Sequence, residues 1–172
     1  MSTSKRLSAF VDTRSTWLVM LTTAVWLAAT AGIRPLMLPD EGRYVGVAWE
    51  MLTAADWLVP RLDGMPFFHK PPLFYWLTTL SLSLFGAHEL PARAASLVAS
   101  LFAAVGLYWF VRRYRDSQLA TLSIVILVTQ PIFYAGSQFA NLDMLVASLI
   151  TLTILAGADA ILRLEEKLPY RA

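Results

Sequence analysis

The sequence predicts an all-α integral membrane protein with four transmembrane helices and two juxtamembrane surface helices. Of its 172 residues, 57% are hydrophobic and only 15% are charged, against about 25% charged in ordinary soluble domains. The apolar residues fall into long blocks, and the basic residues cluster between these blocks. Such blocks are typical of helices in a bilayer rather than of the hydrophobic core of a soluble domain. The absence of cysteine excludes disulfides and thiolate metal sites.

Five apolar blocks compete for the membrane, and one is too short to cross it. The second block holds about 14 residues, whereas a spanning helix needs about 20. It also begins with Phe74, Tyr75 and Trp76, and aromatic side chains of this kind favour the membrane interface. The blocks cover residues 17–33, 72–85, 91–111, 119–135 and 142–162.

The distribution of basic residues favours a surface position for the second block. If it lies flat, nine of the 14 Lys and Arg residues fall on the cytoplasmic side and five fall outside. If it crosses, the cluster "RRYR" and the C-terminal tail move outside, leaving four inside and ten outside. The positive-inside rule therefore predicts four spans with both termini in the cytoplasm. The formal net charge of +2 is too small to indicate a nucleic-acid partner.

This topology divides the chain into a membrane domain and two cytoplasmic tails. The tails cover residues 1–16 and 163–172, and the domain covers residues 17–162. The first apolar block resembles a signal peptide in its flanks, but its length and the further spans favour a retained helix. Helical spacing of apolar residues and the prolines before residue 73 predict surface helices at 41–53 and 71–85. Small residues at every fourth position of the 91–111 span predict close helix packing.

The stretch "LPDEGRY" follows the first span and carries Asp40, Glu41, Arg43 and Tyr44. Asp40 has a structural explanation, because Asp is a favoured N-cap. The functional alternative is that one carboxylate of the Asp40 and Glu41 pair acts as a general base or holds a divalent cation. Arg43 and Tyr44 would then orient a substrate.

The stretch "FFHKPPLFYW" places a lysine before two prolines. Pro71 makes Lys70 extended, and the two prolines remove backbone donors from the helix start. A phosphate bound there would need the Lys70 ammonium. The alternative is a lysine that reaches toward the lipid headgroups. His69 is a packed interfacial residue or a metal ligand, and imidazole favours zinc or manganese over magnesium.

The stretch "FANLDMLV" places Asn141 and Asp143 at the outer start of the last span. Either residue can simply cap that helix. However, the predicted topology brings Asp143 to the membrane face that also holds Asp40 and Lys70. This shared face predicts a single site for the three residues.

The segments "LPDEGRYVGVAWEML", "DWLVPRLDGMPFFHKPPLFYWL", "FGAHELPARAAS" and "QFANLDMLVA" resemble the N-terminal module of the polyisoprenyl-phosphate-dependent glycosyltransferases with the GT-C fold. The similarity is greatest to the aminoarabinose transferases of lipid A and to the wider family 39, which includes protein mannosyltransferases. It covers the chain from Trp17 onward.

The resemblance implies a role for each candidate residue. Asp40 is implied as the catalytic acid or base, with Glu41 beside it, and Lys70 as the ligand of the carrier phosphate. Asp143 is implied to lie near the site with Asn141, and it is a candidate metal ligand together with His69. Where relatives commonly have Glu before the lysine, this chain has His69, which leaves the metal (Zn, Mn or Mg) and its need open.

The implied function is transfer of a sugar from a polyprenyl-phosphate donor to a lipid A, other glycan or protein acceptor, on the periplasmic face of the bacterial inner membrane. Such enzymes are about three times longer, so we expect this chain to be a fragment, inactive alone and completed by further spans or by a second chain. The alternative is a non-catalytic membrane module that binds a polyprenyl-phosphate lipid or assembles with a partner.

Overall fold

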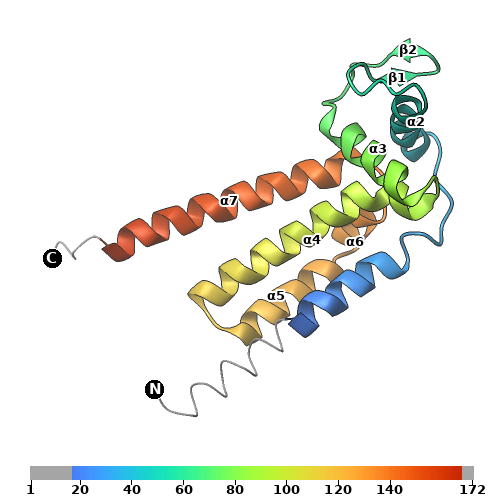
Figure 1. Ribbon diagram of the computed structural model, residues 1–172. Helices are drawn as coiled ribbons and strands as arrows, with labels where there is room; N and C mark the ends of the chain where they lie inside the picture. Colours follow the sequence, from blue (N-terminus) through green and yellow to red (C-terminus); the bar gives the residue numbers. More distant parts are fainter. Residues whose placement is uncertain (1–16, 168–172) are drawn as a thin grey trace.

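The computed structural model describes residues 17–167, which form a mostly helical fold with one small hairpin (Figure 1). The hairpin joins β1 (Arg61–Leu62) and β2 (Met65–Pro66), which pair antiparallel in a segment where the sequence predicts only a loop. The helices are Trp17–Ala29, α2 (Asp40–Thr53), α3 (Leu73–Phe85), α4 (Glu89–Tyr114), α5 (Ser117–Thr129), α6 (Pro131–Ser137) and α7 (Leu142–Lys167).

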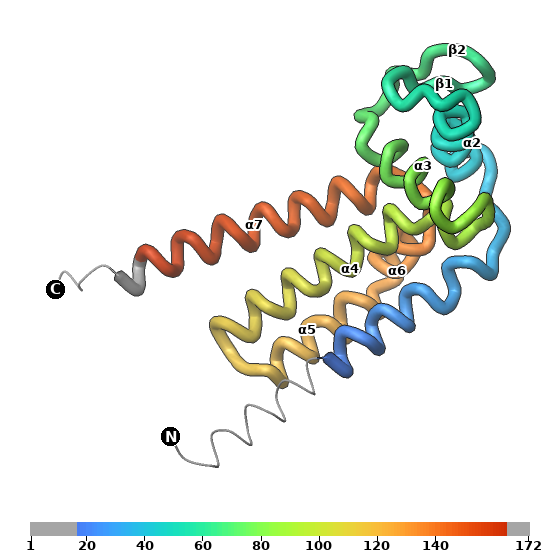
Figure 2. The backbone as a smooth tube through the Cα atoms, viewed as in Figure 1, coloured from blue at the N-terminus to red at the C-terminus, as the bar shows by residue number. Residues whose placement is uncertain are grey.

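The short helices α2 and α3 gather with the hairpin at one end of the molecule, and the longer helices extend away from that end (Figures 1 and 2). Helices occupy both segments where the sequence predicts surface helices, at 41–53 and 71–85. The two helices pack on each other and α3 packs on α4, with the Thr79 hydroxyl donating to the Ala48 carbonyl across the interface at 3.0 Å. The resulting cap covers one end of the bundle.

Helix α4 runs through the centre of the bundle, as its small residues predict. Its alanines and serines are buried and let α3, α5 and α7 pack closely against it. One apolar cluster joins α4 to α2, α3 and the start of α7, and another joins it to the first helix, α5 and α6. The buried small residues of α4 are Ala92, Ala95, Ser96, Ala99, Ser100, Ala103 and Ala104.

Among the described residues, two helices are long and apolar enough to cross a membrane, and a third span results if α5 and α6 count together. The two are α4 and residues Leu142–Leu164 of α7. The first helix, Trp17–Ala29, is apolar but shorter than a full span. The structure thus supports two or three of the four predicted spans.

The segment where the sequence predicts a span at 119–135 is not one continuous helix. The chain bends by 71° between α5 and α6, because Pro131 has no N–H to continue the helix and its ring clashes with the preceding turn. Gln130 accordingly has extended backbone angles, as a residue before proline does. The bend turns α6 toward the first helix, where Gln138 donates to the Leu27 carbonyl at 2.7 Å.

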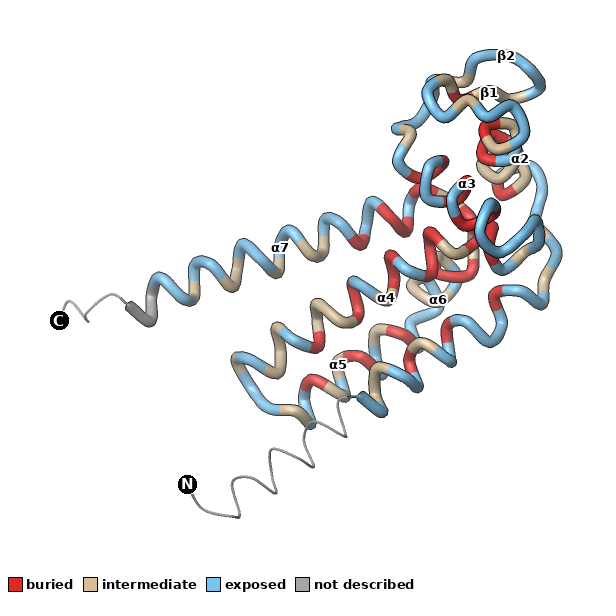
Figure 3. The backbone as a smooth tube through the Cα atoms, in the orientation of Figure 1, coloured by how far each residue is buried: buried red, intermediate tan, exposed pale blue. Residues whose placement is uncertain are grey.

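Helix α7 leaves most of its apolar surface uncovered by the rest of the chain (Figure 3). Only 11% of its most apolar stretch is buried, against 44% for α4. The buried residues of α7 lie in its first two turns, where Leu142 and Leu145 pack under α2 and α3. The start of α7 is therefore fixed beside the cap formed by α2 and α3.

Candidate active site at the capped end of the bundle

Glu41 lies at the centre of the capped end, and its carboxylate is fully buried. The Arg93 guanidinium donates to both oxygens, from Nε to Oε1 at 2.8 Å and from Nη2 to Oε2 at 3.0 Å. Arg34 contributes a third guanidinium contact at 2.9 Å. The backbone N–H groups of Met37 and Ala140 donate to Oε2 and Oε1, each at 2.8 Å. This carboxylate therefore ties together four separate segments of the chain.

Arg93 is equally well satisfied, although it is a buried charge near the start of the central helix. Besides Glu41, its guanidinium donates to the carbonyls of Ala31, Arg34 and Pro35 in the segment that follows the first helix. Charges this deeply buried are tolerated only when paired and hydrogen-bonded. The pair thus joins α4, α2 and the end of the first helix into one rigid unit.

The partners of Glu41 also determine its ionisation. Burial disfavours the charged carboxylate, but the hydrogen bonds from Arg93, Met37 and Ala140 outweigh this effect and lower the pKa of Glu41 from 4.5 to about 2. A carboxylate with its oxygens filled by protein donors is poorly placed to accept a substrate proton. The geometry favours a structural role for Glu41 over the catalytic role that the sequence predicts.

Asp40, directly before Glu41, has the opposite environment. Its side chain is 62% exposed, and within the described residues its ion-pair partner is Arg43, one helical turn later, at 3.8 Å. The N-cap position of α2 belongs to Pro39, and no side chain caps the helix. The structural explanation of Asp40 as an N-cap is therefore wrong, and its carboxylate faces away from the protein interior.

Lys70 is exposed and makes no hydrogen bond or ion pair with the part of the chain that the structure describes. It stands just before α3, whose N-cap is Pro72. Beside it, the His69 ring stacks on Phe67 with ring centroids 4.6 Å apart. His69 is itself exposed.

An aromatic contact places the starts of α2 and α3 next to each other. Tyr44, one turn after Asp40, meets Phe74 edge-on with ring centroids 5.7 Å apart, and Phe74 lies one turn after Lys70. Tyr44 also lies 6.2 Å from the ring of Tyr75. Burial, with a smaller effect of Tyr44, raises the pKa of Tyr75 to about 12, so this hydroxyl stays protonated.

Asn141 and Asp143 mark the start of α7 beside the same unit. The Asn141 amide donates to Asp143 Oδ2 at 3.4 Å, and Asp143 is exposed. Ser96 of α4 donates to the Asn141 carbonyl at 3.2 Å. Since Ala140 donates to Glu41, the first turn of α7 lies next to the first turn of α2.

The structure thus brings the segments of the predicted site to one end of the bundle without joining all of its side chains. Asp40 contacts Arg43, and Asn141 contacts Asp143, but within the described residues no hydrogen bond or ion pair links Lys70 to either carboxylate. A shared pocket for Asp40, Lys70 and Asp143 stays a prediction. No three His, Asp or Glu side chains converge in residues 17–167 as metal ligands would. The predicted metal role of His69 and Asp143 therefore has no complete ligand set there.

The sequence prediction missed Arg93 and Arg34, the two arginines that hold Glu41. Arg93 carried a usable signal, because it interrupts a helix of small and apolar residues in "ELPARAAS". An arginine in such a helix needs an acidic partner. No pattern in the sequence identified that partner, which is 52 positions away.

Comparison with known proteins identifies relatives of this chain. Residues 69–168 match the family described as dolichyl-phosphate-mannose-protein mannosyltransferase. The undecaprenyl phosphate-alpha-4-amino-4-deoxy-L-arabinose arabinosyl transferase of Enterobacter sp. is 35% identical over 125 residues, which cover 72% of this chain and 22% of that protein. Its counterpart from Pectobacterium atrosepticum is 30% identical over 87% of this chain and 27% of its own length.

Solved structures agree with these matches. The structure of ArnT from Cupriavidus metallidurans bound to undecaprenyl phosphate superposes with a TM-score of 0.73 at 29% identity, over 80% of this chain and 26% of that one. The same enzyme in the apo state gives a TM-score of 0.73 at 28% identity. The chain thus spans about a quarter of the length of the relatives it matches. By the match across residues 69–168, the chain belongs to the dolichyl-phosphate-mannose-protein mannosyltransferase family.

Proposed function

We propose that this chain forms the part of a membrane glycosyltransferase that holds the phosphate of a polyprenyl-phosphate-linked sugar. The observation that carries the proposal is the environment of Lys70. It is an exposed cation without a protein partner among the described residues, at the end of the bundle where α2 and α7 begin. A solved relative is bound to undecaprenyl phosphate.

Two prolines, which carry no backbone N–H group, stand between Lys70 and Leu73, the first residue of α3. The backbone N–H groups that can bind phosphate at this helix N-terminus begin at Leu73, so a phosphate held beside the two prolines is bound by the Lys70 ammonium. The Lys70 ammonium is a compact charge that binds phosphate oxygens without a fixed geometry. The prolines also hold its backbone extended, which keeps the side chain outside the helix.

In the proposed reaction, an acceptor oxygen attacks the anomeric carbon of the sugar as the bond from that carbon to the carrier phosphate breaks. Lys70 stabilises the negative charge that develops on the leaving phosphate. Asp40 takes the proton from the acceptor hydroxyl, and an exposed carboxylate with only Arg43 nearby is available for this step. Glu41 holds the backbone of α2 in place and transfers no proton.

Asn141 and Asp143 follow Ala140, whose backbone N–H donates to Glu41 at 2.8 Å. We propose that they orient the acceptor, a lipid A, other glycan or protein hydroxyl. The distribution of basic residues supports a position of this end of the bundle on the periplasmic side of the bacterial inner membrane. Groups that close over the acceptor would come from further spans of the same protein or from a second chain.

Binding of undecaprenyl phosphate to the purified chain, measured by native mass spectrometry, tests the proposal. A hydrogen bond to a charged group is worth about 1.5–3 kcal/mol, so Lys70→Ala should weaken binding by about 10- to 100-fold. Arg61→Ala removes a positive charge from the same cap, and binding should hardly change. Equal binding by the Lys70→Ala variant would refute the role of Lys70.

Asp40→Asn separates the two proposed roles. This variant should bind undecaprenyl phosphate as well as the parent, because Asp40 acts on the acceptor. In an assay where the parent chain transfers sugar, with its completing spans supplied as a second chain if needed, Asp40→Asn should lose about 10²- to 10⁴-fold in rate. Binding by the parent without any transfer would instead favour the non-catalytic lipid-binding module.

A further inference from the structure

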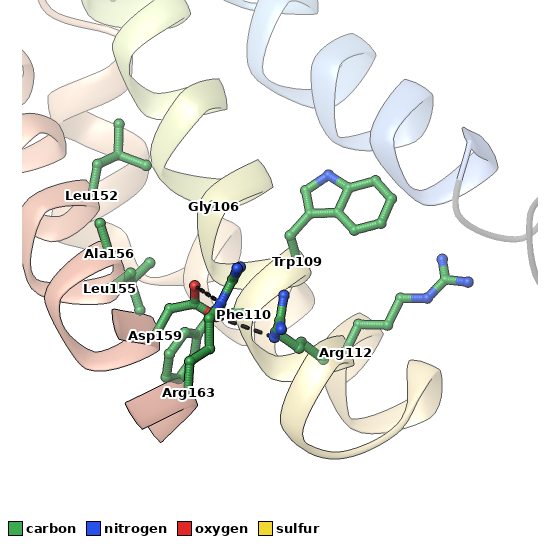
Figure 4. Close-up of a pocket in the computed structure, with 10 residues that line it drawn as sticks. Gly106, Trp109, Phe110, Arg112, Leu152, Leu155, Ala156, Asp159 and Arg163 are labelled. Carbon is green, nitrogen blue, oxygen red and sulfur yellow. Dashed lines mark ion pairs between the residues drawn. The ribbon is translucent and has the colours of Figure 1, made fainter. Parts of the chain in front are cut away.

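A groove opens between α4 and α7 at the end of the bundle away from the α2 and α3 cap, and it encloses about 550 Å³ (Figure 4). We infer that this groove binds an anionic glycerophospholipid of the membrane leaflet opposite the candidate active site. The inference is independent of the proposed glycosyltransferase function, because it uses none of that site's residues. Its volume falls within the usual range of about 300–1,000 Å³ for ligand sites.

The walls of the groove change in character along its length. Toward the bundle centre they are apolar, with Gly106 and Phe110 from α4 and Leu152 and Leu155 from α7. A side chain at Gly106 would meet Leu152 Cδ2 at 2.5 Å, so the two helices approach closely there and close that end. Toward the helix ends the lining becomes basic. A binding partner must therefore be apolar at one end and negatively charged at the other.

The basic end is built around one carboxylate. Asp159 Oδ1 lies 3.2 Å from Arg113 Nε, and Asp159 Oδ2 lies 2.7 Å from Arg163 Nε. Figure 4 shows the Arg163 side chain beside this carboxylate, with dashed lines for the ion pairs. Among the described side chains of this cluster, two guanidinium groups share one negative charge, which leaves a surplus positive charge. Asp159 thus holds two arginines from different helices close together, as a phosphate group requires.

A third arginine adds to this positive field. Arg112 also lines the groove, and its guanidinium lies 5.6 Å from the ring centre of Trp109 and 5.9 Å from that of Tyr108. Stacking on aromatic rings holds a guanidinium in a defined orientation. Tryptophan and arginine together are typical of the headgroup level of a membrane.

These features favour an anionic phospholipid over a zwitterionic one. Basic pockets between transmembrane helices bind acidic headgroups, and each nearby arginine contributes about 1 kcal/mol, or about fivefold in affinity. In contrast, the ammonium group of phosphatidylethanolamine would find one carboxylate among the described lining residues, Asp159, which two arginines already occupy. The acyl chains would lie along the apolar walls formed by Phe110, Leu152 and Leu155.

Native mass spectrometry of the delipidated chain can test this site with phosphatidylglycerol, phosphatidylethanolamine and undecaprenyl phosphate as separate probes. We expect tighter binding of phosphatidylglycerol than of phosphatidylethanolamine. Arg113→Gln and Arg163→Gln should each weaken phosphatidylglycerol binding about fivefold. Arg115→Gln is the matched control, because Arg115 is exposed at the same membrane face but does not line the groove.

The position of the lipid can be checked with phosphatidylglycerol brominated in its acyl chains, which quenches nearby tryptophan fluorescence. The quenching by this lipid should fall in a Trp109→Phe variant, whereas replacement of Trp57 in the cap should leave it unchanged. If circular dichroism shows that Arg113→Gln does not fold, phosphatidylglycerol binding by Arg163→Gln is the test. The Arg163 side chain is 51% exposed, so its replacement should leave the fold intact.

Equal binding of the two phospholipids, or unchanged binding in Arg163→Gln, would overturn the inference. Preferential binding of undecaprenyl phosphate that is lost in Arg163→Gln would assign the groove to the carrier lipid and would also overturn it. A dimer that disappears in Arg163→Gln without any lipid effect would assign the groove to a second copy of the chain.

Discussion

Arg93 and Glu41 form a buried two-point ion pair that joins the central helix to the cap, with contacts of 2.8 and 3.0 Å. Removing one partner of such a pair typically costs about 3–5 kcal/mol, because the other charge stays buried and unpaired. We therefore expect Arg93→Met to lower the free energy of unfolding in detergent by that amount, measured by denaturant titration.

Two controls test whether the effect comes from the unpaired charge. Arg61→Gln removes an exposed contact with Asp56 at 3.8 Å and should cost at most about 1 kcal/mol. The double variant Arg93→Met with Glu41→Leu removes both charges and should be more stable than Arg93→Met alone. If Arg93→Met lowers the free energy of unfolding no more than Arg61→Gln does, the Arg93–Glu41 pair does not stabilise the packing of the cap on α4.

The same network predicts an acid-sensitive cap. Folding lowers the pKa of Glu41 from 4.5 to about 2, so the folded state binds fewer protons than the unfolded state between these values. The contribution of Glu41 to stability is therefore complete above about pH 4.5 and is lost as the pH falls toward 2. The free energy of unfolding, measured across this pH range, should fall toward pH 2 by an amount that is absent in the Glu41→Gln variant. A pH profile shared by both proteins would contradict the prediction.

Asp40 should be dispensable for folding even though it begins α2. Its exposed side chain caps nothing, so Asp40→Ala should change the free energy of unfolding by less than about 0.5 kcal/mol. Asp116 provides the comparison, because it caps α5 by accepting from the Leu119 N–H at 2.8 Å. Asp116→Ala should cost about 0.5–2 kcal/mol. If Asp40→Ala is the more damaging of the two, Asp40 has a structural role after all.

The predicted sidedness can be measured directly, because the chain contains no native cysteine. A cysteine replacing Ala87, exposed between α3 and α4, should react with a membrane-impermeant maleimide added to intact cells. A cysteine replacing Gln118, exposed at the start of α5, should react only after the membrane is opened. Reversal of the two labelling patterns would place the α2 and α3 cap in the cytoplasm.

Much of the fold could be predicted from local patterns. The helical spacing after Asp40 and the prolines before Leu73 predict α2 and α3, and the small residues of α4 predict its central position. Pro131 is a signal for a bend in the sequence, but the apolar residues on both sides of it predict one span. Apolar composition alone therefore overestimates the length of a continuous helix where a proline interrupts the backbone hydrogen bonds.

The candidate site was harder to predict because its roles depend on contacts distant in the sequence. Asp40 and Glu41 are adjacent acids with the same local signals, yet one is exposed and the other is held by Arg93 and Arg34. The difference arises from which face of α2 packs against α4. A sequence pattern can identify the pair of acids, whereas only the fold assigns a separate role to each.

The central claim is that Lys70 binds the carrier phosphate, and a dipolar coupling between nitrogen and phosphorus measures that contact directly. The chain has three lysines, Lys5, Lys70 and Lys167. With lysine side chains labelled at ¹⁵Nζ, undecaprenyl phosphate added, and phosphorus-free detergent, solid-state NMR reports any ammonium near the ³¹P nucleus. We predict a close contact, with N···O about 2.7–2.9 Å, that disappears in Lys70→Arg because that variant lacks the labelled Nζ. No contact in the parent chain, or an unchanged contact in Lys70→Arg, would contradict the account.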